Sequence, residues 1–331
     1  MSKFLDYYSR RDVQKALLAV AEDREVSARF GQGFGKRPDV LEFPGDVLEM
    51  AKRGATSFHV SEERWDDVFD LKPGMPKREM DENRKGWDLI LDIDTPHWDY
   101  ARWTTYYLIE ALKSYGIKSI FLKFSGSKGF HIGVPFESFP EEVKGMKTQE
   151  LFPEAPKVIT LYLENMIKSH LSAKILEGTD VEEVAKKCEK TVDEVMKDGE
   201  FNPFVLVDID TILISSRHLF RAPYSMHEKL GLVSIPIDID KCLEFKKEDA
   251  EPSKVKCDKG YLVREGVDRG EAKGLIIQAY DDWYSKSKKN IYLEGHEEVK
   301  ETGNFEVPKE AVPEEFFPPC IKNILEKGME D

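Results

Sequence analysis

Two short acidic motifs contain the residues of this sequence that are best suited to chemistry. Asp92 and Asp94 end the apolar run LILDID, and Asp208 and Asp210 end the apolar run FVLVDID. In a strand, side chains two positions apart point to the same side, so each motif places two carboxylates together. Neighbouring carboxylates repel one another unless a cation lies between them, and oxygen ligands suit Mg²⁺ or Mn²⁺. Taken alone, each motif is equally compatible with a strand end that runs into solvent.

A glycine-rich turn lies between the two acidic motifs and reads SGSKGFH over residues 125–131. Two glycines in a tight turn let backbone N–H groups face outward and bind an anion. Ser125 adds a hydrogen-bond donor and Lys128 a positive charge. The spacing is not that of a Walker phosphate loop, and an ordinary hairpin turn is the alternative interpretation.

Two stretches of the chain contain basic residues and no acidic ones, although the chain as a whole is acidic. The formal charge is −14, from 49 lysines and arginines against 63 aspartates and glutamates. The acid-free stretches are residues 117–136 and residues 211–227, and the second contains Arg221 and His227. Chance clustering is the alternative, but in so acidic a chain a local anion site is the better interpretation. Acids for metal ions and cations for a triphosphate together form the apparatus of two-metal phosphoryl transfer.

The elements around these motifs predict a mixed α/β core. We expect a strand over residues 87–94, a helix over 97–116, a strand over 117–124 and a further strand over 130–136. A strand–helix–strand unit of this length predicts a right-handed crossover between parallel strands. The turn at 125–129 should then fold the last strand back as a hairpin.

The remaining elements are predicted from periodicity and from glycine and proline positions. Residues 1–30 are expected to be helical, with another helix around 45–53. Two helices are expected over residues 157–198, the second running from 180 to 198 with a solvated, charged face. Residues 203–210 are expected to form a strand.

Composition narrows the class of protein. The chain has 331 residues, 40% of them hydrophobic and 11% aromatic, which excludes a disordered protein. Its length suggests about two domains, or one large domain with appendages. No apolar run is long enough for a membrane span, and the first residues lack the apolar core of a signal peptide. Four scattered cysteines argue against a disulfide framework or a structural zinc site and indicate a reducing, cytoplasmic compartment.

The order of these motifs resembles the small catalytic subunit of archaeal and eukaryotic DNA primase, in the archaeo-eukaryotic primase superfamily. The matching segments read LILDIDTP, FSGSKGFHIGVP and LVDIDTILISSRHLFRAPYSMHEKLGLVSIPI, within residues 88–237. The glycine-rich turn also resembles the polymerase domains of bacterial end-joining ligases, in the same superfamily. The resemblance implies an α/β (mixed α+β) fold. It would be a primase-polymerase catalytic core with an RRM-like sheet that bears the acids, plus helical insertions at about 156–200.

The resemblance also implies roles for individual residues. Asp92 and Asp94 match the catalytic metal-binding pair, and Asp208 matches the third ligand. Asp210 is the alternative third ligand, because the spacing to the next motif differs by about one residue. Two divalent ions, Mg²⁺ or Mn²⁺, are implied as cofactors. The positions that match nucleotide contacts are Ser125, Gly126, Lys128, Gly129, His131, Arg221 and His227, and also His59 and Arg24, for which a plain surface residue is an equal alternative.

Two departures from the family pattern bear on partners. The clustered Cys and His residues of the family's zinc knob are not visible in this sequence. The C-terminal segment FFPPCIKNIL resembles the start of the iron–sulfur domain of the primase large subunit, but Cys320 alone cannot hold a cluster. We expect a catalytic domain over residues 1–300, then a linker and the start of a C-terminal helical region over 301–331. The chain would then be the N-terminal part of a fused primase, or would act with a large subunit.

These features predict a DNA primase or polymerase that synthesises and extends primers on a DNA template in replication. An end-joining or repair primase-polymerase is an alternative within the superfamily. A phosphatase of the haloacid-dehalogenase type is an alternative of another class, because LILDID resembles its nucleophile motif and Asp281 and Asp282 supply a late acidic pair. Against it, that motif needs Thr or Val two places after the second Asp, where Pro96 stands. A non-catalytic binding module is disfavoured, because paired carboxylates repel a phosphate backbone.

Overall fold

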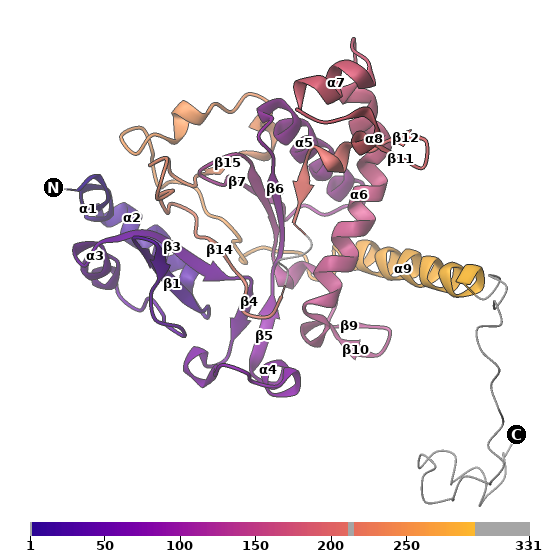
Figure 1. Ribbon diagram of the computed structural model, residues 1–331. Helices are drawn as coiled ribbons and strands as arrows, with labels where there is room; N and C mark the ends of the chain where they lie inside the picture. The colour runs from indigo at the N-terminus through magenta and orange to yellow at the C-terminus, as the bar shows by residue number, and fades with distance from the viewer. Residues whose placement is uncertain (1, 211–214, 295–331) are drawn as a thin grey trace, which may run out of the picture. The chain divides into compact units, whose positions relative to one another are not determined.

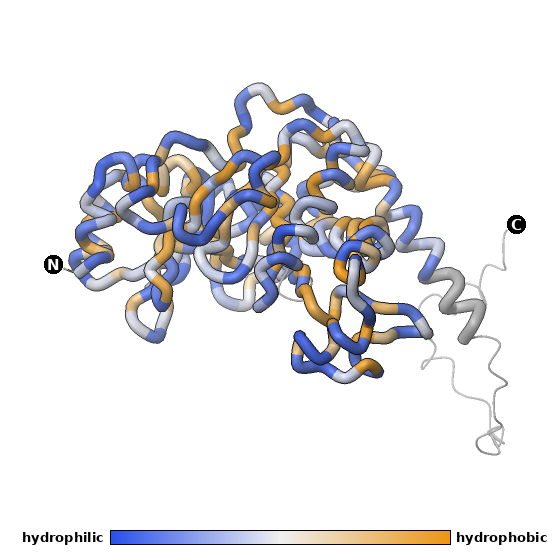
Figure 2. Tube along the Cα trace, turned by 90° about the horizontal axis from the view of Figure 1, so that it is seen from above, coloured by the Kyte–Doolittle hydropathy of each residue, from blue (hydrophilic) through white to orange (hydrophobic). Residues whose placement is uncertain are grey.

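The computed structural model describes residues 2–210 and 215–294 (Figure 1). The chain forms two compact units, residues 1–285 and residues 286–331. No helix in the described part is long and apolar enough to cross a membrane, and in Figure 2 hydrophilic and hydrophobic stretches alternate along the chain. The linker and helical region predicted over 301–331 lie outside the described residues. The cysteines that the structure describes are free, namely Cys188, Cys242 and Cys257.

A five-stranded sheet forms the centre of the first unit. Its order is β13-β6-β8-β7-β15, and each neighbouring pair is antiparallel. Because β6 and β7 are both antiparallel to β8, they run parallel to each other as predicted, but β8 lies between them. The predicted helix between β6 and β7 is confirmed as α5 (Trp98–Ser114), which stops before Gly116 at a φ of 80°. The strands are β13 (Asp208–Ile209), β6 (Leu89–Asp94), β8 (Phe130–Val134), β7 (Phe121–Phe124) and β15 (Pro236–Ile237).

The two faces of this sheet differ because side chains alternate along each strand. In β6 the residues at odd positions pack in a core with α5 and α6, whereas Asp92 and Asp94 lie on the opposite face. The register pairs Asp92 with His131 on β8, and His131 with Lys123 on β7. In Figure 1, α5 and α6 lie on one side of the sheet, and α1 to α3 with the second sheet lie on the other. The alternation of side chains along β6 therefore places the apolar residues in the core and the two aspartates on the opposite face.

A second sheet, in the order β14-β3-β1-β2, packs with α1, α2 and α3 around its own core. The helix predicted over residues 1–30 is correct for α1 and α2 but wrong for residues 26–30. These residues form β1 because they pair with β3 along their whole length. The helix predicted around 45–53 is confirmed as α3. The elements are α1 (Lys3–Tyr8), α2 (Arg11–Ala21), α3 (Pro44–Lys52), β1 (Val26–Phe30), β2 (Gly33–Phe34), β3 (Ala55–Ser61) and β14 (Leu219–Arg221).

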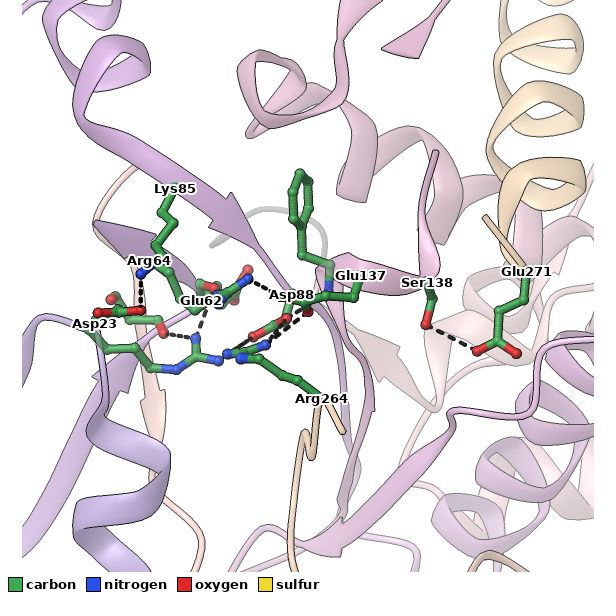
Figure 3. Close-up of polar contacts among 12 residues, drawn as sticks. Asp23, Glu62, Arg64, Lys85, Asp88, Glu137, Ser138, Arg264 and Glu271 are labelled. Carbon is green, nitrogen blue, oxygen red and sulfur yellow. Dashed lines mark hydrogen bonds and ion pairs between the residues drawn. The ribbon is translucent and has the colours of Figure 1, made fainter. Parts of the chain in front are cut away.

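A buried ion pair joins the two sheets, in the network of polar contacts around Asp88 that Figure 3 shows. Arg24, which precedes β1, is fully buried and pairs with Asp88, which precedes β6. Arg264, which lies in neither sheet, also contacts Asp88, at 3.2 Å, and Arg84 pairs with Glu63 at 2.8 Å within a separate two-stranded sheet. A buried charge is costly without its partner, so the pair of Arg24 and Asp88 holds the two sheets in a fixed relation. The elements of this region are β4 (Glu63–Trp65), α4 (Lys77–Asn83) and β5 (Arg84–Trp87).

The segment between β8 and β13 is more broken than its periodicity predicts. The second helix predicted over 180–198 is wrong as one element, because Asp180 and Thr191 each cap a separate helix start. The strand predicted over 203–210 begins as a 3₁₀ turn, since Asn202 caps that turn and Pro203 starts it. The elements are α6 (Glu154–Ile175), α7 (Val181–Lys187), α8 (Val192–Val195), β9 (Glu142–Val143), β10 (Met146–Lys147), β11 (Met196–Lys197), β12 (Glu200–Phe201) and, later, α9 (Lys273–Glu294).

Candidate active site

One cavity of about 650 Å³ gathers most of the residues that the sequence singles out. The central sheet contributes its acids, the turn between β7 and β8 its polar side chains, and the second sheet a basic wall. Segments that are far apart in the sequence therefore meet here. The lining residues are His59, Asp92, Asp94, Ser125, Ser127, Lys128, His131, His218, Leu219, Phe220, Arg221, His227, Glu228, Lys229, Leu230 and Lys247.

Four aspartates lie on one face at the edge of the central sheet. Asp208 is opposite Asp94 in the antiparallel register, and the N–H of Asp210 donates to the carbonyl of Asp92 at 3.0 Å. Residues opposite one another in such a pair point to the same side. Burial raises the pKa of Asp92 to about 7, with Lys123 opposing and Asp94 and Asp210 adding to the rise. The pKa of Asp208 is also raised, by burial first and then by Asp210 and Asp94.

The chemistry of this donor set fits a divalent cation. Carboxylate oxygens are hard ligands, and the raised pKa values reflect a repulsion that a cation would relieve. Glu164 of α6 adds another carboxylate near Asp208, and burial and Asp208 raise its pKa to about 7. In the part of the chain that the structure describes, no three His, Cys, Asp or Glu side chains stand close enough to form a ready-made metal site. A bound cation would therefore have to draw the aspartates together.

Ser125 holds the turn between β7 and β8 together. Its hydroxyl accepts hydrogen bonds from the N–H groups of Ser127 and Gly129, both at 3.3 Å. Its own N–H donates to the carbonyl of Gly129 at 3.0 Å. The prediction of an outward-facing nest is wrong for these two N–H groups, because they point into the turn. The turn instead offers the cavity the side chains of Ser125, Ser127 and Lys128.

Close packing explains Gly129, and the backbone conformation explains Gly126. A Cβ atom on Gly129 would lie 1.6 Å from the carbonyl oxygen of Ile93, between the two aspartates of β6. Gly126 has a φ of 94°, and a Cβ there would lie 3.4 Å from Cβ of His227 and 3.5 Å from Cδ of Arg221. The turn is thus wedged between the acidic strand and the basic wall, which fixes its position relative to both.

His131 and Lys123 form a buried row beside Asp92. Nε2 of His131 lies 3.3 Å from Oδ1 of Asp92. Burial, followed by the charges of Lys123 and Arg221, lowers the pKa of His131 well below its ordinary value. The ring is therefore neutral although it lies beside Asp92, and its Nδ1 has no hydrogen-bond partner among the described residues. Lys123 is fully buried, and its Nζ donates to Oγ of Ser234 at 2.8 Å.

The opposite wall of the cavity is basic. Nη2 of Arg221, on β14, pairs with Oε2 of Glu228 at 2.8 Å. Nδ1 of His227 accepts hydrogen bonds from the N–H groups of Lys229 at 3.3 Å and Leu230 at 3.2 Å. Burial, then Arg221, lowers the pKa of His227. The neutral ring therefore carries its proton on Nε2, where it can serve as a donor to a ligand.

His218, unlike His227, is a histidine of the cavity whose pKa is raised. Its Nδ1 lies 3.0 Å from Oε1 of the buried Glu62. Burial alone would lower the pKa of His218, but Glu62, with Asp210 and Asp92 nearby, raises it. At neutral pH this histidine is therefore charged to a greater extent than an exposed one.

Comparisons with known proteins point to one family. Residues 90–239 match the family model of the DNA primase small subunit. The chain is 29% identical over 238 residues to the DNA primase small subunit PriS of Pyrobaculum aerophilum, covering 61% of this chain and 72% of that protein. Both matches support the archaeo-eukaryotic primase family for this chain.

Two further similarities were found. The chain is 27% identical over 217 residues to an uncharacterized protein of Methanocaldococcus jannaschii, covering 61% of this chain and 41% of that protein. The chain thus spans about two fifths of the length of that relative. Among solved structures, the polymerase domain of Mycobacterium tuberculosis ligase D in complex with DNA aligns with a TM-score of 0.43 and 14% identity, over 84% of this chain and 88% of that one. The mixed α/β fold class is confirmed by the sheets and helices described above.

Most of the predicted site residues line the cavity, but five do not, namely Asp208, Asp210, Gly126, Gly129 and Arg24. Asp208 stands on β13 beside β6, Asp210 directly follows β13, and Gly126 and Gly129 shape the turn. Arg24 is directed elsewhere, because its guanidinium pairs with Asp88 and donates to the carbonyls of Ser61 and Glu62. The predicted residues that line the cavity are His59, Asp92, Asp94, Ser125, Lys128, His131, Arg221 and His227.

Sequence reasoning did not single out Glu228 and Lys247, which line the cavity. It placed Lys123 and His218 in the two acid-free stretches without giving either a role, although the strand period puts Lys123 on the face of His131 rather than of the core. Lys247 had no signal, because it begins a 3₁₀ turn beyond the last motif.

Proposed function

We propose that this protein is a template-dependent nucleotidyltransferase that makes and extends primers from nucleoside triphosphates in replication. The observation that carries the proposal is the union, in one cavity, of carboxylates from β6 with cations from the adjacent turn and the second sheet. Cations alone would serve an anion-binding protein, and carboxylates alone would repel a triphosphate. Their combination suits the transfer of a nucleotidyl group with release of pyrophosphate.

Different residues of the cavity would bind the triphosphate and position the carboxylates. Lys128, Arg221 and His227 would neutralise and orient the triphosphate, with Ser125 donating a hydrogen bond. His131, whose neutral ring lies beside the Asp92 carboxylate, would hold that carboxylate in place. Two divalent ions, Mg²⁺ or Mn²⁺, would lower the pKa of the primer 3′-hydroxyl and take up charge on the leaving pyrophosphate.

The third carboxylate of the metal site is proposed to be Asp208. It lies directly opposite Asp94, whereas Asp210 lies beside Asp92 and already supports it through a backbone hydrogen bond. Comparing Asp208→Asn with Asp210→Asn tests this assignment. We expect the first to lose nucleotide incorporation and the second to retain a measurable part of it. The opposite order would assign the role to Asp210.

Primer extension with Mg²⁺ or Mn²⁺, using ribonucleotides and deoxyribonucleotides in parallel, tests the proposed activity. Asp94→Asn should abolish incorporation while the thermal unfolding temperature stays the same or rises, because one repelling charge is removed. Asp198→Asn is the matched control, since Asp198 is exposed and Asn tolerates its positive φ of 55°. A folded Asp94→Asn protein with full activity would refute the proposal.

The proposed partners are a DNA template and either a large primase subunit or a fused iron–sulfur domain. The similarity to a protein named DNA primase small subunit supports this choice over end-joining or repair. An assay without primer distinguishes a replicative primase from an end-joining enzyme, because primer synthesis needs initiation and end-joining does not. We propose residues 1–300 as the catalytic domain. The phosphatase alternative loses its late acidic pair, since Asp281 on α9 pairs with Lys144 at 2.7 Å and does not line the cavity.

A further inference from the structure

A single carboxylate, that of Glu228, pairs with two arginines, of which Arg221 lines the cavity. Oε2 of Glu228 lies 2.8 Å from Nη2 of Arg221, and its Oε1 lies 3.2 Å from Nη1 of Arg29. Arg221 comes from β14 and Arg29 from β1, so Glu228 bridges two strands of the second sheet. The three side chains are largely buried, with 13% of Glu228, 11% of Arg221 and 23% of Arg29 exposed.

The backbone holds Glu228 in this position. It follows His227, whose ring nitrogen and carbonyl accept hydrogen bonds from the N–H groups of the next turn. Gly231 allows that turn to close at a φ of 72°. Burial alone would raise the pKa of Glu228, but Arg221 lowers it below its ordinary value, so the side chain is a carboxylate at neutral pH. Glu228 lines the same cavity as Lys128 and the aspartates of β6.

The chemistry of this contact is that of phosphate recognition. Guanidinium groups bind carboxylate and phosphate oxygens through the same paired N–H donors. Two largely buried arginines with no anion beside them would be unneutralised, at a cost in stability. Glu228 supplies that anion from within the chain. A phosphate that used the same N–H donors would have to displace it.

We propose that Glu228 is an internal competitor for Arg221 of the triphosphate site and for its neighbour Arg29, displaced when a nucleotide binds, and that it sets the selectivity for a full triphosphate. The inference rests on the function proposed above. Displacing a bridging carboxylate requires a ligand that restores the lost contacts and charge. A triphosphate restores more of that charge than a diphosphate does, so the competition weakens binding of diphosphates more.

A purely positioning role for Glu228 predicts the opposite change in nucleotide affinity when Glu228 is neutralised. If Glu228 only aims the two arginines at the nucleotide, its neutralisation lets them move and weakens binding. If Glu228 competes, its neutralisation frees the arginines and strengthens binding. The direction of the change in affinity therefore separates the two roles.

The experiment measures binding of ATP, ADP, dATP and dADP, each with Mn²⁺, by calorimetry on the full chain and on Glu228→Gln. We expect the triphosphate dissociation constant to fall by about tenfold, the scale of one charge-assisted hydrogen bond, and the diphosphate constant to fall further. Glu251→Gln is the control, because Glu251 pairs with Lys254 at 3.3 Å on the surface. It should leave all four constants unchanged.

Each outcome decides between the proposals. Equal or weaker triphosphate binding by Glu228→Gln, with binding by the unaltered chain intact, overturns the role of Glu228 and leaves the proposed function standing. Binding by neither protein overturns both. A Glu228→Gln protein that fails to fold is checked with Glu228→Ala, and failure of both variants to fold shows a purely structural counter-ion and also overturns the inference.

Discussion

Gly129→Ala should disable the site through one methyl group. Gly129 has no positive φ, so alanine brings no backbone strain and only the added atom matters. That atom would lie 1.6 Å from the carbonyl oxygen of Ile93 and 2.8 Å from its carbonyl carbon. Both contacts are to backbone of β6, which cannot rotate away as a side chain could.

The size of the effect follows from these distances. An ordinary contact for such an atom begins at 3.4 Å, so the turn and β6 must separate by nearly 2 Å. Overpacking of this kind costs about 1–3 kcal/mol or more, which for a unit of this size lowers the unfolding temperature by roughly 2–10 °C. Misplacing catalytic groups by about 1 Å costs on the order of a hundredfold in rate. We therefore expect loss of incorporation well beyond the loss of stability.

The assay pairs thermal unfolding with primer extension at a temperature where the variant is fully folded. Gly45→Ala is the control, because Gly45 lies in the first turn of α3, has no positive φ and leaves open space for a Cβ. It should keep its activity and its stability. A folded Gly129→Ala protein with unchanged incorporation would show that the contact between the turn and β6 does not position the site.

Two further predictions concern charge. Asp88→Asn should lower the free energy of unfolding by about 3–5 kcal/mol, because it leaves Arg24 buried without its anion. Burial alone would raise the pKa of Asp88, but Arg24 and Arg264 hold it well below its usual range, so its stabilisation is present above pH ~4 and lost as pH falls. Urea unfolding between pH 3 and 7 measures the free energy of unfolding of both proteins. If Asp88→Asn lost as much of it at low pH as the unaltered chain does, the prediction would be wrong. Since the pKa of Asp92 is raised to about 7, activation by Mn²⁺ should need more metal as pH falls from 8 to 6, and a pH-independent requirement would count against Asp92 as a ligand.

Local patterns in the sequence predicted the centre of the fold. The apolar alternation of β6 fixed which face carries Asp92 and Asp94, and the helix that follows was predicted within a few residues of α5. Predictions were wrong where pairing or capping overrode periodicity. Residues 26–30 form a strand because β3 supplies their hydrogen bonds, and α7 and α8 are separate because Asp180 and Thr191 cap new starts.

The sequence by itself therefore determined the chemical types present, namely paired carboxylates, a glycine-rich turn and a basic stretch, and their order along β6, β7 and β8. Only the tertiary structure decided which of them meet. It removed Arg24 from the site by pairing it with Asp88. It also brought together His218 just before β14, Glu228 in the loop after β14, and the buried Lys123 of β7, which lies beside the cavity-lining His131. The reason is that strand period is a local property of the chain, whereas ion pairing and burial depend on neighbours that lie far away in the sequence.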